Sequence, residues 1–499
     1  MTRYASLAES ARRAATDGMP GAAAVDGPIA WTWRELDVRA DAAARGLLGA
    51  GVRSGDRVAL LAGPSAAAIA ALHGIARVGG IAAPLGTWLT IGELTLAGEV
   101  IRPDLVVHGD GLEAGARALG GSARPLADLA ETSAAPMHEA LLLPPADPAA
   151  PAVVVLTSGT TSRPKAVVLS TAAMVASAGA WLAALPEVTG WLLALGLSHV
   201  AGLGVVWRSA LSGVPLVVLE RADPAAIVDA LSAAPGPSHV SLVPTTLARV
   251  LDAVDDAPPP STLRAVLLGG GTIPAELVRR AISAGWPVVP TYGLSEAGSG
   301  VTALPTRDAA IHPASAGPAL PGVRIRIAEP DHDGVGEILV SSPGRFTGYL
   351  DDPAATAATV SDDGWLRTGD LGRVDADGRL TVLDRRTDRI VRGGENISPA
   401  EVEAVLLEHP AIAGAVVVAR RDGTFGQVPV AAIVLRDGHA DPGDEELVRL
   451  CRERLAAFKV PVGFIRFDAL PRTDSGKPLH AELRARLDPA QPVEQESPA

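Results

Sequence analysis

Residues 156–170 read LTSGTTSRPKAVVLS and follow the apolar run Ala152–Leu156, which predicts a buried strand. Hydroxyl groups and backbone N–H groups in such a turn can surround phosphate oxygens, and Lys165 adds a compact positive charge behind Pro164. No Walker-type GxxxxGK pattern is present, so the stretch predicts a phosphate-holding loop of another kind, with a plain Ser/Thr-rich turn between strands as the alternative. The candidate phosphate-binding residues are Thr157, Ser158, Gly159, Thr160, Thr161 and Lys165.

Lysine is scarce in this chain: among the 43 Lys and Arg residues, only Lys165, Lys459 and Lys477 are lysine. The planar fork of arginine cannot replace a flexible ammonium group where a single oxygen must be neutralised during a reaction. Lys165 and Lys477 both lie in turns rich in Gly, Ser and Thr. The retention of lysine at position 459 is interpreted as chance. The two turns are therefore candidate sites of phosphate chemistry.

Length and composition bound the class of protein. A chain of 499 residues predicts two or more domains, and 48% hydrophobic with 20% charged residues is typical of a globular protein. The most apolar stretch, Val58–Leu85, is interrupted by prolines, His73 and Arg77, which argues against a membrane span, and the N-terminus has no apolar segment typical of a secretory signal. The single cysteine, Cys451, excludes an internal disulfide and fits a reducing cytoplasm. A net charge of −13 without a basic run argues against nucleic acid and for a small-molecule substrate.

Helix and strand patterns alternate as far as Pro290 and predict an α/β domain in which helices cover parallel sheets. Thr32 and Glu35 have the capping-box spacing ahead of a helical pattern that runs to Leu48. Residues 111–151 are rich in Ala and Pro and are expected to be an irregular connection. A second helix is expected at Ser65–Val78, and the expected strands are Arg57–Ala62, Gly80–Pro84, Leu105–His108, Ala152–Leu156, Trp191–Leu197, Val214–Leu219, His239–Val243, Leu263–Leu268 and Trp286–Pro290.

The pattern changes after Gly317, where short alternating segments with Gly and Asp turns predict a small β unit. A boundary is expected at Arg385–Asp388. It divides a large N-terminal domain (1–384) from a smaller α+β C-terminal domain (388–487), and residues 488–499 are expected to be a disordered tail. Within the C-terminal domain the expected helices are Pro399–Glu408 and Asp444–Ala457, and the expected strands lie near Ala415–Val418 and Pro429–Leu435.

A second glycine-rich segment follows the expected strand Leu263–Leu268 and precedes a helical pattern, which is where a nucleotide lies in a doubly wound sheet. The motif TYGLSEAG follows the next expected strand, and its tyrosine, one of three in the chain, is a candidate to stack on a purine. Mg²⁺ is usually held by one or two carboxylates with substrate phosphate oxygens, so Glu296 is a candidate ligand, with a surface acid as the alternative. The candidates of this region are Gly269, Gly270, Gly271, Tyr292, Gly293, Ser295 and Glu296.

Three further turns carry candidate residues. Asp370, expected on a Gly-flanked turn, can accept hydrogen bonds from two ribose hydroxyls, and Arg385 can join it, although Asp-Gly pairs are also common in plain hairpins. The segment RGGENISPAEVE, residues 392–403, is unusually dense in glycine for a turn before a helix start. Lys477 lies on the loop PRTDSGKPLH, far along the chain from Lys165.

Six motifs, in this order and spacing, resemble the serial motifs of the adenylate-forming superfamily of acyl-CoA synthetases and AMP-dependent ligases: TSGTTSRPK, GGGTIP, YGLSE, GWLRTGD, DRRTDRIVRGGENISPAEVE and PRTDSGK. The resemblance covers essentially the whole chain, which makes it far more specific than any one motif. Within the superfamily, the stretches LSHVAGLGVVWRSALSG, SLVPTTLARVL and LRAVLLGGGTIPAELV are most similar to the o-succinylbenzoate–CoA ligase branch of menaquinone biosynthesis.

The resemblance implies a two-step reaction that uses ATP, Mg²⁺ and coenzyme A. A carboxylate attacks the α-phosphate of ATP to give an acyl-adenylate and pyrophosphate, and the thiol of coenzyme A then displaces AMP. His199 matches the position that lines the acyl pocket, although an isolated histidine in an apolar stretch is more often a satisfied core residue. The other implied roles are charge stabilisation by Lys477, β- and γ-phosphate binding by Thr157–Lys165, magnesium binding by Glu296, adenine binding by Tyr292 and Gly269–Gly271, and ribose binding by Asp370 and Arg385.

The resemblance also implies that the small C-terminal domain is mobile and swings between the two half-reactions. One face, with Lys477, serves adenylation, and the other, with Gly393 and Gly394, meets coenzyme A. The pivot position corresponds to Thr387, where many relatives carry Asp or Lys. Two further departures, at positions of the phosphate loop where glycine is usual and where a side chain can stiffen the loop, are Ser162 and Ala166.

Three other interpretations stay open on the sequence. An amino-acid-activating domain of a peptide synthetase shares most motifs, but its substrate-binding acid is expected near Ser198–Gly202, which reads SHVAG. A stand-alone ligase for another aryl or fatty acid, with coenzyme A or a different acceptor, is the closer rival; a dicarboxylate substrate could pair with Arg208, for which a helix-surface arginine is the plainer interpretation. A non-catalytic nucleotide-binding homologue is opposed by the retained Lys165, Glu296, Asp370 and Lys477. The identity of the acid and the presence of a homodimer are not readable from the sequence.

Overall fold

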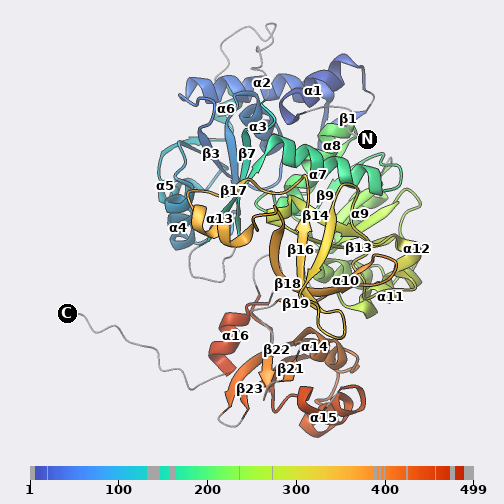
Figure 1. The fold of residues 1–499 in the computed structure, drawn as a ribbon. Helices are drawn as coiled ribbons and strands as arrows, with labels where there is room; N and C mark the ends of the chain where they lie inside the picture. The colour runs from blue at the N-terminus through green and yellow to red at the C-terminus, as the bar shows by residue number, and fades with distance from the viewer. Residues whose placement is uncertain are drawn as a thin grey trace, which may run out of the picture. The chain divides into compact units, whose positions relative to one another are not determined.

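The computed structural model of the 499-residue chain describes residues 6–19, 21–131, 147–157, 164–234, 236–271, 273–385, 390–392, 395–397, 399–422, 425–455, 457–472 and 478–487 (Figure 1). The chain forms two compact units. The large unit comprises Met1–Arg326, Leu339–Thr368 and Ala376–Leu380, and the small unit comprises Ile327–Ile338, Gly369–Asp375 and Thr381–Ala499. Segments that precede residue 384 thus belong to the small unit, so the domain boundary expected between residues 384 and 388 stays a prediction.

The first sheet of the large unit has seven strands in the order β17-β8-β7-β4-β3-β5-β6. The neighbours from β7 to β6 are parallel, whereas β8 is antiparallel to β7 and β17 is antiparallel to β8. The parallel strands are linked through helices, as the alternating pattern predicts. The elements are β3 (Arg57–Leu61), α3 (Ala66–Arg77), β4 (Ile81–Leu85), α4 (Ile91–Ile101), β5 (Leu105–His108), α5 (Glu113–Leu119), β6 (Ser122–Pro125), α6 (Asp128–Glu131), β7 (Pro151–Thr157), β8 (Lys165–Ser170) and β17 (Gly348–Tyr349).

The second sheet has eight strands in the order β14-β13-β12-β11-β9-β10-β1-β2. Its centre is parallel, and antiparallel pairs close both ends, β1 with β2 and β13 with β14. The elements are β1 (Ala22–Asp26), β2 (Ile29–Thr32), α7 (Thr171–Ala184), β9 (Trp191–Leu193), α8 (Val200–Ser212), β10 (Leu216–Val218), α9 (Pro224–Ser232), β11 (His239–Leu242), α10 (Pro244–Ala253), β12 (Ala265–Leu268), α11 (Ala275–Ser283), β13 (Val288–Leu294) and β14 (Ser299–Ala303), with the short α12 (Thr306–Ala309) behind them.

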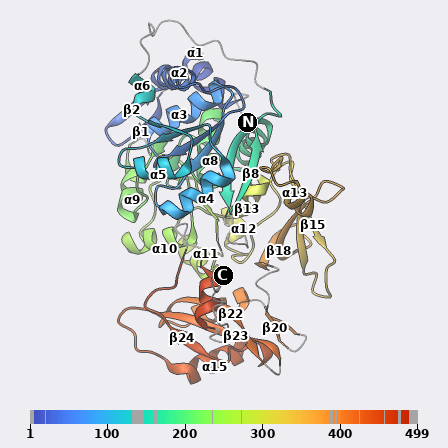
Figure 2. The same ribbon diagram turned by 90° about the vertical axis from the view of Figure 1, so that its left-hand side faces the viewer.

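Helices α1 (Leu7–Thr16), α2 (Trp33–Gly49) and α3 pack side by side (Figures 1 and 2). Helix α2 begins at the predicted capping box: the Glu35 backbone N–H donates to Thr32 Oγ1 at 3.2 Å, and the Thr32 backbone N–H donates to Glu35 Oε2 at 2.8 Å. Gly74 of α3 permits the close approach of α2, because a Cβ atom there would lie 2.7 Å from Ala43 Cβ. The predicted helices near residues 32 and 65 are thereby confirmed.

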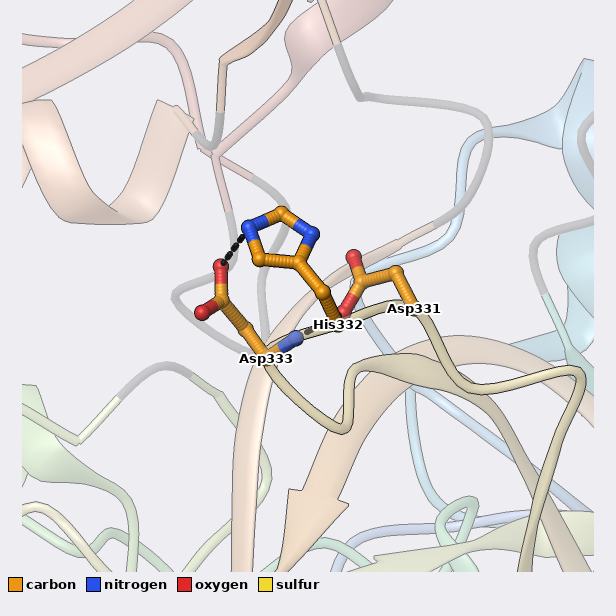
Figure 3. A group of neighbouring side chains, drawn as sticks. All are labelled: Asp331, His332 and Asp333. Atoms are coloured by element: carbon orange, nitrogen blue, oxygen red, sulfur yellow. Dashed lines mark hydrogen bonds and ion pairs between the residues drawn. The ribbon is translucent and has the colours of Figure 1, made fainter.

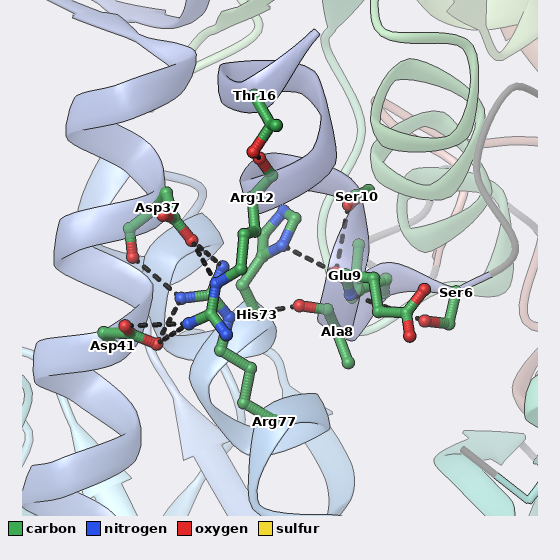
Figure 4. A network of polar contacts seen from close by, with 11 residues as sticks. Ser6, Ala8, Glu9, Ser10, Arg12, Thr16, Asp37, Asp41, His73 and Arg77 are labelled. Atoms are coloured by element: carbon green, nitrogen blue, oxygen red, sulfur yellow. Dashed lines mark hydrogen bonds and ion pairs between the residues drawn. The ribbon is translucent and has the colours of Figure 1, made fainter. Parts of the chain in front are cut away.

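Ion pairs around the buried Arg77 link α1, α2 and α3 (Figure 4). The Arg77 side chain is fully buried and pairs with Asp37 at 2.5 Å and with Asp41 at 2.6 Å, both on α2. Arg12 of α1 adds an ion pair to Asp41 at 2.7 Å. A buried charge is tolerated when it is paired and hydrogen-bonded, so these contacts hold the three helices together.

Two buried histidines are expected to make the fold sensitive to acid. Burial lowers the pKa of His73 in α3 to about 3 and that of His239 in β11 to about 4, from the ordinary 6.5. His73 Nδ1 donates to the Leu7 carbonyl at 2.9 Å, as a neutral ring can. Below about pH 6.5 the unfolded chain binds protons that the folded chain does not, so each histidine removes about 1.4 kcal/mol of stability per pH unit as the pH falls.

The apparent melting temperature, followed by circular dichroism, should therefore fall between about pH 7 and about pH 5, and the variant His73→Asn should lose about half of this pH dependence. Equal melting temperatures at the two pH values, or an unchanged pH dependence in the variant, would contradict the assignment.

A third sheet has four strands in the order β15-β16-β18-β19. The small β unit predicted after Gly317 is confirmed by these strands. Two other expectations, for Asp370 and for residues 111–151, are wrong. Asp370 lies in a strand and not on a turn; its neighbour Gly369 has a positive φ of 71°, which marks a local irregularity in an extended strand. Residues 111–151 include α5, β6 and α6 and are not an irregular connection throughout. The strands are β15 (Arg324–Ala328), β16 (Gly336–Ser341), β18 (Leu366–Val374) and β19 (Leu380–Arg385).

The small unit has its own core, which lies on both faces of the hairpin formed by β22 and β23. Alternating residues of β22 face the two sides, so Val417 packs in one cluster and Val418 in the other. The helices and strands predicted after residue 388 are confirmed, with both strands longer than expected. The elements are β20 (Ile390–Arg392), β21 (Glu395–Ile397), α14 (Pro399–Leu407), β22 (Ile412–Asp422), β23 (Gly426–Leu435), α15 (Gly443–Arg454), β24 (Phe464–Arg466) and α16 (His480–Leu487).

Among the described residues, none of the helices combines the length and the apolar character that crossing a membrane requires.

Candidate active site

The predicted phosphate-holding loop joins two antiparallel strands. Thr157 ends β7 and Lys165 begins β8, and the two residues face each other across the hairpin. Thr157 Oγ1 donates to the Lys165 carbonyl at 3.4 Å. The loop residues between them, Ser158, Gly159, Thr160, Thr161 and Ser162, lie outside the described residues.

Lys165 and Glu296 both contact one tyrosine, Tyr349. The Lys165 ammonium is 4.9 Å from the centre of the Tyr349 ring, and the Tyr349 hydroxyl donates to Glu296 Oε1 at 2.8 Å. Burial and the Glu296 carboxylate raise the pKa of Tyr349 well above its ordinary value, so the hydroxyl keeps its proton and remains a donor. The structure thus brings together two candidates that are 131 positions apart, through a residue that the sequence analysis did not select.

Glu296 sits on the short 3₁₀ turn Ser295–Ala297, directly after β13. Its carbonyl accepts a hydrogen bond from the Phe346 backbone N–H at 2.8 Å, which fixes the turn beside the segment that carries Tyr349. Because Oε1 accepts from Tyr349, Oε2 is the oxygen left for a cation. A single partly buried carboxylate of this kind fits Mg²⁺ held jointly by protein and phosphate oxygens.

The two glycine-rich motifs meet at the carboxyl ends of neighbouring parallel strands, β12 and β13. Gly269 permits this approach, because a Cβ atom there would lie 2.3 Å from Thr291 Oγ1. Strand β13 continues through Tyr292 and Gly293 and does not end at Pro290 as expected. Gly293 has no room for a side chain, since its Cβ atom would lie 1.7 Å from the Ser299 carbonyl oxygen. The end of a parallel sheet lined by glycines is a suitable place for a nucleotide.

His199 lies at the start of α8 as its N-cap residue, and its side chain does not cap the helix. The ring is half-buried and stacks on Trp88, with 6.2 Å between ring centres and 21° between ring planes. Beside it, the Ser198 hydroxyl is buried without a hydrogen-bond partner. His199 is thus only half-buried, and it lies next to a buried serine hydroxyl.

Arg208 is buried inside the large unit, with 2% of its surface exposed, so the interpretation as a helix-surface arginine is wrong. Its guanidinium carbon lies 4.5 Å from the centre of the Trp191 ring and 5.4 Å from that of Trp181. Nη2 is 3.5 Å from Ser241 Oγ, and Nε has no hydrogen-bond partner. Among the residues that the structure describes, no carboxylate pairs with Arg208, and burial lowers its pKa to about 9.

The buried guanidinium lies near Gly204 and Ser299. Helix side chains lean toward the helix N-terminus, and a Cβ atom at Gly204, one turn earlier, would lie 3.7 Å from Arg208 Nη1 and 3.7 Å from Ser299 Oγ. Ser299 follows Glu296 by three residues and has a positive φ of 105°. The absence of a side chain at Gly204 leaves room for a small group beside the cation.

The remaining candidates lie in the small unit. The Gly369 backbone N–H donates to Glu337 Oε1 at 3.1 Å, which steadies the strand at Asp370. Arg385 ends β19, and the position of its side chain is outside the description. The predicted hinge, coenzyme A and catalytic residues also lie outside the described residues: Thr387, Gly393, Gly394 and Lys477.

One group of potential metal ligands is unrelated to these motifs. Asp331, His332 and Asp333 lie on the exposed turn between β15 and β16, with ligand atoms within 4.8 Å of one another (Figure 3). Asp331 Oδ1 accepts backbone N–H groups of Asp333 and Val335 at 3.0 and 2.9 Å. The cluster is therefore explained as the side-chain closure of a turn.

Comparison with known proteins gives consistent matches over both units. The family model described as AMP-binding enzyme matches residues 11–350, and the model of the AMP-binding enzyme C-terminal domain matches residues 401–477. The chain is 35% identical over 466 residues to 2-succinylbenzoate–CoA ligase of Bacillus cereus (strain Q1), covering 92% of this chain and 94% of the relative.

Two solved structures from Bacillus subtilis are similar over nearly the whole chain. The o-succinylbenzoate CoA synthetase in complex with its acyl-adenylate intermediate matches with a TM-score of 0.88 and 32% identity, covering 95% of this chain and 98% of that one. The same enzyme with ATP and magnesium ion matches with a TM-score of 0.85 and 32% identity, covering 95% and 99%.

Proposed function

We propose, since this chain belongs to the AMP-binding enzyme family, that it is an adenylate-forming ligase that joins o-succinylbenzoate to coenzyme A. The acid attacks the α-phosphate of ATP to give an acyl-adenylate and pyrophosphate, and the coenzyme A thiol then displaces AMP. ATP and Mg²⁺ serve the first step, and coenzyme A is the co-substrate of the second.

The burial of Arg208 without a described carboxylate partner is the observation that supports o-succinylbenzoate as the acid. A guanidinium buried without a carboxylate partner is unfavourable unless an anion reaches it. o-Succinylbenzoate has two carboxylates, so one can be activated while the other meets this cation. An acid with a single carboxylate leaves Arg208 unpaired, which is how the pocket distinguishes the two classes of substrate.

We propose for the other residues the roles that the matching motifs imply. Lys165 and the loop before it hold the β- and γ-phosphates, and Glu296 holds Mg²⁺ against them. The turn Gly269–Gly271 and the strand end at Tyr292 and Gly293 frame adenine, with Ser295 beside the phosphates. His199 lines the acid pocket. In the small unit, Asp370 and Arg385 hold ribose, Gly393 and Gly394 meet coenzyme A, Thr387 is the hinge, and Lys477 stabilises the charge that develops on the phosphates.

Magnesium binding by Glu296 can be tested with the conservative variant Glu296→Gln. Glu296→Gln keeps an oxygen that can accept from the Tyr349 hydroxyl but removes the charge, so the Mg²⁺ concentration needed for half-maximal turnover should rise roughly tenfold. The measurement is a magnesium titration of pyrophosphate release, with the exposed Glu276→Gln as the matched control. An unchanged response to magnesium would remove Glu296 from the site.

The proposed substrate is tested with a panel of acids, followed by pyrophosphate release with and without coenzyme A. The panel contains o-succinylbenzoate, benzoates, and short and medium fatty acids. The highest kcat/KM is expected for o-succinylbenzoate, with dependence on coenzyme A for multiple turnovers. If a fatty acid or a simple benzoate is preferred, the proposed adenylation step stands, but o-succinylbenzoate is not the substrate.

We also propose that the protein is cytoplasmic and forms a homodimer. A single buried thiol, Cys451, suits a reducing compartment. The oligomeric state is tested by light scattering of the purified protein, where a mass near twice the 50.7 kDa of the chain is expected.

A further inference from the structure

Tyr349 contacts two opposite charges, those of Lys165 and Glu296. The Lys165 ammonium lies 4.9 Å from the centre of the ring, and the Tyr349 hydroxyl donates to Glu296 Oε1 at 2.8 Å. Neither charged group forms an ion pair with any residue that the structure describes. Both charges therefore have Tyr349 as a partner in place of one another.

The backbone of the tyrosine is anchored from two sides. Its strand pairs with β8, so that Tyr349 faces Val167, and the Leu350 N–H donates to the Ala166 carbonyl at 2.8 Å. The Tyr349 N–H donates to Thr356 Oγ1 at 2.9 Å. Because strand residues two positions apart share a face, the ring lies on the same face of β8 as Lys165.

The side chain is anchored as well. The Phe346 ring meets the Tyr349 ring edge to face, with 5.0 Å between their centres. Phe346 is 1% exposed, and its backbone N–H holds the Glu296 carbonyl at 2.8 Å. The ring, the magnesium candidate and the phosphate-loop lysine therefore belong to one packed arrangement.

We propose that Tyr349 is a positioning residue that keeps Lys165 and Glu296 apart and aims the Glu296 carboxylate. The inference rests on the proposed function, in which these two charges meet the nucleotide phosphates and Mg²⁺. A direct lysine–glutamate pair would have to be broken whenever nucleotide binds, and binding would weaken by the stability of that pair. The ring prevents the pair, while the hydroxyl fixes one carboxylate oxygen and leaves the other for the cation.

Two variants distinguish the role of the Tyr349 ring from that of its hydroxyl. Tyr349→Phe keeps the ring and loses the hydroxyl, and Tyr349→Leu loses both. The measurement is the Kd of ATP by titration calorimetry, without acid or coenzyme A, once with Mg²⁺ and once with EDTA. Tyr349→Phe should weaken binding about tenfold in Mg²⁺ only, whereas Tyr349→Leu should weaken it about tenfold in EDTA as well.

A double variant tests the spacer directly. In Tyr349→Leu combined with Glu296→Gln, no carboxylate remains for Lys165 to pair with, so the affinity for ATP in EDTA should return to the wild-type value. A merely structural role of the tyrosine predicts no such rescue. Thermal unfolding of each variant identifies a loss of fold, and if Tyr349→Leu does not fold, Tyr349→Phe decides alone through its magnesium-specific loss.

The outcomes distinguish this inference from the function on which it rests. Wild-type protein that does not bind ATP with Mg²⁺ contradicts the proposed function. Wild-type binding with equal affinities in both tyrosine variants, or no rescue by Glu296→Gln, overturns the spacer role alone.

Discussion

Replacing Arg208 with methionine is expected to raise KM for o-succinylbenzoate about 100-fold or more, because the second carboxylate of the acid loses its buried partner. The effect on kcat should be small, since the change lies at the distal end of the acid. A simple benzoate should be used equally well or better by the variant, because its binding no longer leaves a buried cation unpaired. The measurement is kcat and KM for both acids.

Thermal unfolding separates this role from a structural one. Methionine has a similar length and suits the surroundings of Trp181 and Trp191, and it removes a charge that no described carboxylate balances. The variant should therefore melt at the same temperature as the wild type or higher. A variant that melts much lower and loses activity on both acids equally would assign Arg208 to the core.

Replacing Lys477 with alanine is expected to reduce acyl-adenylate formation about 100-fold to 1,000-fold, because one group that meets the developing phosphate charge is lost. The second half-reaction should remain largely intact, since it forms no new charge on the triphosphate. Arginine at this position should rescue only part of the activity, because the chain otherwise favours Arg and yet retains Lys here.

The test is a separate assay of each half-reaction. Pyrophosphate release from acid and ATP reports the first, and thioester formation from chemically supplied acyl-adenylate and coenzyme A reports the second. Lys459→Ala, the remaining lysine of the small unit, is the matched control, because its Nζ pairs with Glu401 at 2.7 Å. Equal losses in both half-reactions of Lys477→Ala would contradict its assigned role.

Local signals predicted the strands and helices well wherever the pattern was periodic. The capping box at Thr32 and Glu35 gave the start of α2, and the apolar run before Thr157 gave β7. Asp370 was misplaced because Gly369 breaks the alternation of β18 and resembles a turn. The short elements between residues 113 and 131 were missed because Ala-rich and Pro-rich segments carry little periodicity.

Side-chain partners were harder to predict, because they depend on contacts between distant segments. Tyr349 joins residues 165 and 296 through a two-residue strand, and its only sequence signal was the rarity of tyrosine. The burial of Arg208 has a clearer signal in the sequence. The helix around it, LGVVWRSAL, is apolar on every side, and an all-round apolar helix is a buried one.

The central claim is that this chain makes an acyl-adenylate and then a thioester from one particular dicarboxylate. The most direct measurement is mass spectrometry of the products formed from o-succinylbenzoate, ATP and Mg²⁺, first without and then with coenzyme A. The acyl-adenylate is expected in the first mixture, and the coenzyme A thioester with AMP in the second. An absence of both products from o-succinylbenzoate, while another acid yields them, would contradict the assigned substrate.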